Sequence, residues 1–298
     1  MQMKIRLALA QWTIRSPDNF AAFAQRISAA VDEAVRDGAQ IVVFPEYLAL
    51  ELAATLRPAT HADFGATLAA LQALHADWLE LFARLARQHR IHLLAGTFLL
   101  AQTNGRYRNR AYFFTPDGQY AFQDKLTLTG FEKDAGVIEP GDALKVFDTR
   151  YGRVAINICY DAEFPLYARA QQQAGVRLLL VPSCTDTDAG ATRVRVGCMA
   201  RALENRLYVA QSVTAGEAPD NPALDTNTGN ATLYVPSDRG MPANGIAAVV
   251  APGATWLIAD VDFASLDATL QTAQVAVPVD WDAQLRPDVA RARVEPFG

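Results

Sequence analysis

The chain has 298 residues, of which 51% are hydrophobic and 20% are charged. This length and composition suit one large α/β domain or two ordinary ones, and they exclude a disordered or fibrous protein. A formal net charge of −5 argues against a nucleic acid or an anionic membrane surface as the main partner.

The cysteines and the first residues of the chain bear on its compartment. Cys159, Cys184 and Cys198 are an odd number with no close pair, so we expect neither a disulfide framework nor a zinc site. No apolar run reaches the length of a membrane span, and residues 1–14 read as a strand rather than as a signal peptide. These features predict a cytoplasmic protein that binds no membrane.

In the first half of the chain, short apolar runs predict strands, and apolar residues at helical spacing predict helices. In chain order we expect a strand at 5–12, a helix at 17–36, a strand at 41–45, a mostly helical segment at 62–90, and strands at 91–99, 110–114 and 120–123. Pro116-Asp117-Gly118 is the expected hairpin turn between the last two strands.

The second half continues the alternation of strands and helices. We expect strands at 144–147 and 154–158, a helix at 165–174, a strand at 178–181, a helix at 192–205, and strands at 207–211, 231–235, 245–250 and 256–261. No linker, charge block or repeat divides the chain, so we expect one domain at 1–275 and an extended C-terminal tail at 276–298. Strand pairs and helices in this order predict an α/β fold with two sheets and helices outside, a layered sandwich.

Cys159 stands at the end of the apolar strand at 154–158 and is followed by a helix start. A nucleophile elbow has this geometry, with the thiol held at the top of a sheet beside unpaired backbone N–H groups. The positive end of the helix would also favour the thiolate. A lone cysteine is more often a small hydrophobic core residue, so this interpretation depends on the rest of the chain.

Three further charged residues lie at or near strand ends. Glu46 follows the buried strand at 41–45, and Lys125 follows the strand at 120–123. Glu132 lies in a glycine-containing loop seven residues after Lys125. Taken alone, Lys125 would usually be a solvated charge, Glu132 would be a loop carboxylate, and Glu46 could equally be an exposed residue that starts a loop. Because Glu46, Lys125 and Cys159 all end predicted buried strands, a layered fold can bring them to one rim.

The order of these residues resembles that of the nitrilase superfamily of carbon–nitrogen hydrolases. FPEY at 44–47 is similar to the family's Glu motif, DKLTLTGFE at 124–132 to its Lys motif with the second Glu, and NICYDAEFP at 157–165 to its Cys motif. The resemblance covers nearly the whole chain. It implies a four-layer α-β-β-α sandwich with two mixed sheets, no cofactor, and a homodimer or higher homo-oligomer formed through the outer helices.

The chain differs from common patterns of the superfamily at two places. Tyr160-Asp161 after the cysteine is similar to the amidase and carbamoylase branches, whereas true nitrilases usually have Trp-Glu there. The His often found two residues after the family's Lys is Thr127 here. The resemblance therefore favours an amidase or carbamoylase over a nitrilase.

The residue types then predict a mechanism. Glu46 would take the proton of the Cys159 thiol and later protonate the departing amine. The Lys125 ammonium and the Tyr160 backbone N–H would stabilise the oxyanion, and Glu46 or Glu132 would activate the water that hydrolyses the thioester. We therefore expect cysteine-dependent hydrolysis of a small carboxamide or N-carbamoyl compound.

The candidate substrate-binding residues adjoin the catalytic candidates or end a neighbouring strand: Tyr47, Tyr160, Cys184 and Thr185. Several alternatives stay open. A nitrilase or an acyl transferase would use the same cysteine, and a non-catalytic binding protein would keep the scaffold alone. A Cys–His dyad is poorly supported, because all four histidines (His61, His75, His89 and His92) precede Cys159 and lie in or beside one helical stretch.

Overall fold

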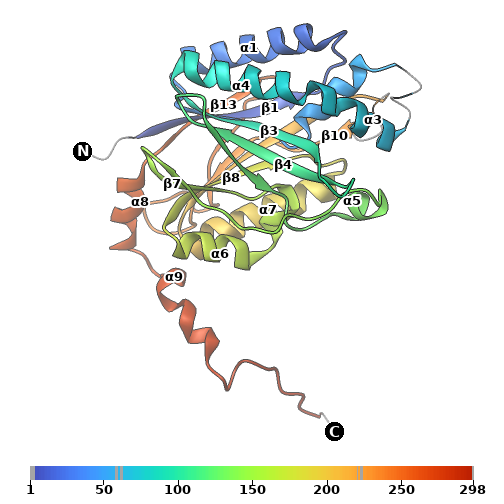
Figure 1. Ribbon diagram of the computed structural model, residues 1–298. Coiled ribbons are helices and arrows are strands. Elements are labelled where there is room, and N and C mark those ends of the chain that lie inside the picture. The colour runs from blue at the N-terminus through green and yellow to red at the C-terminus, as the bar shows by residue number, and fades with distance from the viewer. Residues whose placement is uncertain (1–3, 58–59, 61–62, 220, 222–223, 297–298) are drawn as a thin grey trace.

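Two β-sheets lie face to face between two layers of helices in the computed structural model, which describes residues 4–57, 60, 63–219, 221 and 224–296 (Figure 1). The first sheet has the strand order β13-β1-β2-β3-β4-β5. Its strands are β1 (Ile5–Thr13), β2 (Ile41–Phe44), β3 (His92–Ala101), β4 (Tyr107–Phe114), β5 (Tyr120–Asp124) and β13 (Trp256–Val261). β1, β2 and β3 are parallel, and the others are antiparallel to their neighbours, so the sheet is mixed.

The second sheet is mixed as well. Its strands are β6 (Phe147–Thr149), β7 (Gly152–Ile156), β8 (Val176–Ser183), β9 (Tyr208–Glu217), β11 (Thr232–Tyr234) and β12 (Ile246–Val249), and β10 (Thr226–Asn227) pairs with the end of β9. β7, β8 and β9 are parallel. β1 pairs with β13 over Ile5–Ala10 and then with β9 over Gln11–Thr13, which joins the two sheets at one corner.

Helices cover the outer face of each sheet. The helices and turns before β7 are α1 (Phe20–Arg36), η1 (Leu48–Thr55), α3 (Phe64–Leu71), η2 (Gln72–Leu74), α4 (His75–His89) and α5 (Gly130–Asp134). Those after it are η3 (Cys159–Glu163), α6 (Pro165–Gln173), α7 (Asp188–Asn205), α8 (Phe263–Leu270), α9 (Val277–Asp280) and η4 (Trp281–Leu285). α1 and α4 lie over the first sheet, and α6 and α7 lie over the second (Figure 1).

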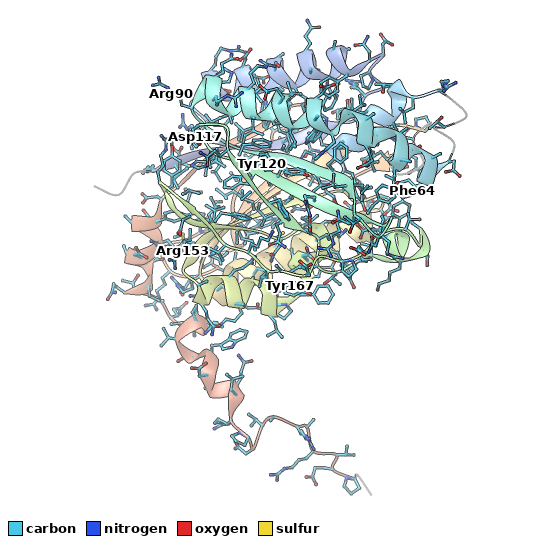
Figure 2. The ribbon with its side chains drawn as sticks, viewed as in Figure 1. Phe64, Arg90, Asp117, Tyr120, Arg153 and Tyr167 are labelled. Carbon is cyan, nitrogen blue, oxygen red and sulfur yellow. The ribbon has the colours of Figure 1, made fainter. Side chains whose placement is uncertain are left out.

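The alternation of side chains along β1 explains why both faces of the first sheet are covered. Ala8, Ala10 and Trp12 pack in the core that includes α1 and α4, whereas Leu7 and Leu9 pack in the core shared with the second sheet. Side chains fill the space between the layers (Figure 2). Each fully buried leucine stabilises the fold by about 1.5–3 kcal/mol relative to an exposed one. The predicted fold class, a four-layer α-β-β-α sandwich with two mixed sheets, is confirmed.

Some elements differ from the sequence prediction. η1, α5 and α8 were not predicted, and the expected extended tail forms α9 and η4 over residues 277–285 before an irregular stretch at 286–296. Pro278 lies in the first turn of α9, where a proline is tolerated because its missing N–H has no intrahelical partner. The tail projects away from the layers (Figure 1). Among the helices of the described residues, none is both long and apolar enough to cross a bilayer.

Candidate active site

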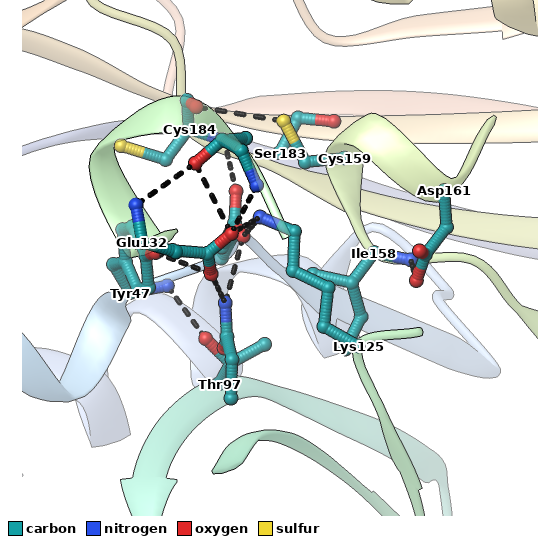
Figure 3. A network of polar contacts seen from close by, with 12 residues as sticks. Tyr47, Thr97, Lys125, Glu132, Ile158, Cys159, Asp161, Ser183 and Cys184 are labelled. Carbon is teal, nitrogen blue, oxygen red and sulfur yellow. Dashed lines mark hydrogen bonds and ion pairs between the residues drawn. The ribbon is translucent and has the colours of Figure 1, made fainter. Parts of the chain in front are cut away.

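Glu46, Lys125 and Cys159 line one pocket at the edge of the sandwich, as their positions at strand ends predict. Figure 3 shows Lys125 and Cys159 in the network of polar contacts around this site. Glu46 comes after β2, Lys125 directly follows β5, and Cys159 begins η3 after β7. Their exposed fractions are 1%, 2% and 3%. Three groups able to exchange protons or charge therefore lie together in a water-poor environment.

A close contact between backbones shapes the turn that carries Glu46. Gly96 in β3 has a φ of +66°, and a Cβ atom there would lie 2.2 Å from the carbonyl oxygen of Pro45. Only glycine allows β3 to approach this turn so closely. Tyr47 has a left-handed φ of 59°, and its N–H donates to Thr97 Oγ1 at 2.8 Å. Glu46 is thus held on an anchored, sharply turned backbone.

Lys125 lies between two carboxylates. Its Nζ is 2.8 Å from Glu46 Oε1 and 2.8 Å from Glu132 Oε2. Burial alone would lower the pKa of Lys125, but the charges of Glu46 and Glu132 raise it well above its ordinary value. The ammonium is therefore kept charged, as the pairing of two carboxylates with one lysine predicts.

Glu132 is buried in α5, not in a loop as the sequence suggested. Thr129 and Glu132 form a capping box, in which the Thr129 N–H donates to Glu132 Oε2 at 2.9 Å. Tyr47 donates its hydroxyl to Glu132 Oε1 at 2.7 Å. Burial acts to raise the pKa of Glu132, but Lys125 and these donors lower it below its ordinary value. Glu132 is therefore an ionised, fully engaged carboxylate.

Two residues of the site were not predicted from the sequence. Asn109, in β4, donates its Nδ2 to Glu46 Oε1 at 2.8 Å and to Glu132 Oε1 at 3.1 Å. Asp161, in η3, accepts the backbone N–H groups of Thr127 at 2.8 Å and of Ile158 at 3.3 Å. Asp161 therefore joins the segment after Lys125 to the segment before Cys159 (Figure 3).

The thiol of Cys159 sits on a strained backbone. Its φ is +47°, and its Sγ donates to the carbonyl oxygen of Cys184 at 3.5 Å. Burial and the charge of Glu46 raise the pKa of Cys159 well above its ordinary value, although Lys125 opposes them. The expectation that a helix end favours the thiolate is therefore wrong for the resting site. The physical reason is that η3 has only five residues, whereas desolvation of the sulfur is nearly complete.

The basicity of Glu46 depends on opposing effects. Burial raises its pKa, Lys125 lowers it, and the like charge of Glu132 raises it again. Glu46 Oε2 accepts the backbone N–H of Cys184 at 3.1 Å, and Cys159 also forms a hydrogen bond to this carboxylate. A carboxylate of raised pKa in contact with a protonated thiol is suited to accept its proton.

A pocket of about 270 Å³ opens onto Cys159. All four candidate binding residues line it, together with Glu46, Lys125, Thr129, Phe131, Glu163, Asp186, Gly190, Arg193, Val194, Asp225 and Thr226. A Cβ atom on Gly197 of α7 would lie 3.0 Å from the Ala162 carbonyl oxygen, so this glycine lets α7 pack close to η3 and form one wall.

Other candidate ligands and nucleophiles lie elsewhere. The lining of this pocket contains none of the described histidines His75, His89 and His92, and His61 lies outside the described residues. Cys198 is buried in α7, away from the pocket lining. Within the described part of the chain, no group of three or more His, Cys, Asp and Glu side chains is arranged to hold a metal ion.

The chain matches a protein-family model and is similar in sequence to known hydrolases. The carbon–nitrogen hydrolase family model matches residues 6–276. A probable hydrolase, YhcX, from Bacillus subtilis (strain 168) is 31% identical over 87% of this chain, and the chain spans only 50% of that protein's length. Omega-amidase NIT2-B from Xenopus laevis is 28% identical, and the match covers 78% of this chain and 82% of that protein.

Solved structures show the same fold. Saccharomyces cerevisiae Nit3, a member of branch 10 of the nitrilase superfamily, has a TM-score of 0.72 at 21% identity, over 92% of this chain and 95% of that chain. An amidase from Nesterenkonia sp. AN1 with acrylamide added to its active site cysteine has a TM-score of 0.67 at 22% identity, over 90% of this chain and 98% of that chain. Because the family model matches residues 6–276, the chain belongs to the carbon–nitrogen hydrolase family and is a hydrolase that acts on carbon–nitrogen bonds.

Proposed function

We propose that this hydrolase cleaves the C–N bond of a small carboxamide or N-carbamoyl compound through a thioester-type intermediate on Cys159. The observation that supports this most is the contact of the buried Glu46–Lys125–Glu132 cluster with a protonated thiol at the wall of a pocket. The pocket's volume, about 270 Å³, suits a small substrate. Relatives named as amidases support the amide as the bond that is cleaved.

In the acylation half-reaction, Glu46 takes the thiol proton as the sulfur of Cys159 attacks the carbonyl carbon. A C–S bond forms, and the carbonyl electron pair moves onto oxygen. The Lys125 ammonium and the Tyr160 backbone N–H are the proposed donors to this oxyanion, each a contribution of about 3 kcal/mol. As the C–N bond breaks, Glu46 returns the proton to the leaving nitrogen, and ammonia or an amine departs.

In the second half-reaction, water attacks the acyl carbon and the thiol is restored. Either Glu46 or Glu132 was a candidate base. Glu132 is completely buried, both of its oxygens accept hydrogen bonds, and it is absent from the pocket lining. Glu46 does line the pocket. We therefore assign the proton transfers of both half-reactions to Glu46 and a charge-balancing role to Glu132.

Turnover with a substrate panel tests the proposal. Carboxamides, N-carbamoyl compounds and nitriles are incubated with the protein, and ammonia release and intact mass are measured. Cys159→Ala should abolish turnover and the acyl adduct while the melting temperature stays near that of the wild type. Cys198→Ala is the matched control, because this cysteine lies outside the pocket lining, and it should remain active.

Three outcomes would contradict the proposal. Equal rates for wild type and Cys159→Ala would remove the nucleophile. Turnover of nitriles alone would identify a nitrilase. Binding of amides without any adduct or product would indicate a non-catalytic protein on this scaffold.

We also propose that the protein forms a homodimer through its outer helices. Leu166 of α6 and Val196 of α7 are 69% and 54% exposed, and Leu203 of α7 is 40% exposed, although all three are large apolar side chains. A second copy of the same surface would cover them in a two-fold arrangement. The domain boundary at residue 275 and the cytoplasmic location stay predictions.

A further inference from the structure

Among the described residues, Asn109 is the only one whose neutral side chain donates hydrogen bonds to both Glu46 and Glu132. It lies in β4 opposite Leu99 of β3, and it is 1% exposed. Its backbone carbonyl accepts the N–H of Lys125 at 2.9 Å. One residue thus touches Glu46 and Glu132 with its side chain and Lys125 with its backbone.

The two hydrogen bonds leave from a single nitrogen. Asn109 Nδ2 lies 2.8 Å from Glu46 Oε1 and 3.1 Å from Glu132 Oε1. An amide nitrogen carries two hydrogens, so it can donate to both carboxylates at once without adding charge. The same Glu46 oxygen also accepts from Lys125, which leaves Oε2 for the backbone N–H of Cys184, beside the thiol of Cys159.

We infer that Asn109 is a positioning residue that holds the two glutamates apart, ionised, and with one Glu46 oxygen turned toward the Cys159 thiol. The inference rests on the proposed function, because it concerns the same base and the same nucleophile. Asn109 does not line the pocket, so it would act through Glu46 and not on the substrate.

The position of Asn109 matters because the charged groups around Glu46 have opposing effects on the pKa of that carboxylate. The titratable groups that face Glu46 are Lys125, Glu132, Cys159, Cys184 and Tyr47. Of these, Lys125 favours the ionised carboxylate, and the like charge of Glu132 opposes it. A donated N–H stabilises an ionised carboxylate over a protonated one. Without Asn109, Glu46 would hold its proton to a higher pH and would be less available as a base.

A leucine at this position tests the inference. Asn109→Leu keeps the approximate shape and removes both donors. Asn109→Asp also removes them and places a third carboxylate beside the other two. The rate at which iodoacetamide alkylates Cys159 is followed from pH 5 to pH 10 by peptide mass spectrometry, which needs no substrate. The kcat/KM profile is measured with any amide that the wild type hydrolyses.

We expect the acid-side midpoint of both profiles to rise by about one pH unit in Asn109→Leu, which corresponds to a roughly tenfold lower rate at neutral pH. In Asn109→Asp the midpoint should rise by more than that. Asn205→Leu is the matched control. Asn205 is also a buried asparagine, its Nδ2 donates to the Arg201 carbonyl at 3.1 Å, and it lies outside the pocket lining. Its midpoint should equal that of the wild type.

A folded Asn109→Leu protein with the wild-type midpoint would overturn the inference, and so would an equal loss of rate at every pH. If leucine prevents folding, Asn109→Ser, which is smaller and keeps one donor, should give a smaller shift in the same direction, and an unshifted profile there would overturn the inference too. A shifted alkylation profile in a protein that hydrolyses no amide would support the positioning role of Asn109 and reject the proposed function.

Discussion

Replacing Lys125 with methionine should destabilise the protein in a pH-dependent way. Methionine keeps the unbranched shape of the buried stem but removes the ammonium that lies 2.8 Å from both Glu46 and Glu132. The cluster of two carboxylates and one ammonium would change its charge from minus one to minus two. Two like charges would then share a site that is almost closed to water.

The expected magnitude follows from the loss of a shared partner. Removing one member of a buried ion pair typically costs about 3–5 kcal/mol, because the remaining charge stays buried and uncompensated. Lys125 serves two carboxylates, so we expect the upper part of this range at pH 8. For a domain of this size, that loss lowers the melting temperature by roughly 6–8 °C.

The sign of the pH dependence follows from Glu46. Burial already raises its pKa, and loss of Lys125 removes the effect that lowers it, so the variant's folded state binds a proton more tightly than the unfolded chain does. A group of raised pKa stabilises the folded state at low pH, and this contribution is lost as the pH rises. The destabilisation should therefore be largest at pH 8 and smaller at pH 5.5.

Chemical unfolding of the wild type and the variants at these two pH values measures the effect. The double variant Lys125→Met/Glu132→Gln restores a charge of minus one and should recover part of the loss at pH 8. Lys145→Met is the matched control, because Lys145 contacts the ring of Phe122 outside this cluster. A Lys125→Met protein as stable as the wild type at pH 8, or one with the same deficit at both pH values, would refute this account.

The remaining predictions concern Glu132 and the assembly. Glu132→Gln should lower kcat about 10²-fold or more in steady-state kinetics, because the charge beside Lys125 is lost. The variant should still fold, because glutamine keeps an oxygen for the capping box. A near-wild-type kcat would show that this carboxylate is structural. Sedimentation at micromolar concentration should give twice the chain mass, and Leu166→Glu should shift the protein toward monomer; a monomeric wild type would reject the dimer.

The sequence was sufficient to predict the parts of the site that lie at strand ends. Glu46, Lys125 and Cys159 each follow an apolar run, and the ends of neighbouring strands converge in a layered fold. The layers themselves followed from runs such as Ile41–Phe44, which is buried on both faces. The spacing of apolar residues and the apolar runs of buried strands are local properties of a chain, so both can be predicted from a single sequence.

Residues whose role depends on distant partners were not predictable in this way. Asn109 lies within a strand, and its two partners are 63 and 23 residues away along the chain. Nothing in the local pattern shows where an amide points. Asp161 had a signal in the Cys motif, but its partners are backbone N–H groups, which carry no residue type.

The local structure around Glu132 could be predicted in part from the sequence. Thr129 and Glu132 have the spacing of a capping box, which marks a helix start. The helix that follows has five residues, too few for a 3.6-residue period to appear. The loop assignment therefore failed because the helix is short. The same reasoning applies to α8, whose start is marked by the Asp262 side chain accepting from the Ser265 N–H at 3.1 Å.

The balance of charge explains why one thiol is accompanied by two buried carboxylates. With Glu46 alone beside it, Lys125 would hold that carboxylate ionised and weakly basic. Glu132 pairs with Lys125 at 2.8 Å and offsets this effect, and its like charge raises the pKa of Glu46. In the acylation step proposed above, negative charge would pass from Glu46 to sulfur and then to the substrate carbonyl oxygen, so the buried site would keep the same net charge throughout. Because no step would create an additional buried charge, the proposed mechanism would avoid the desolvation cost that normally opposes such chemistry.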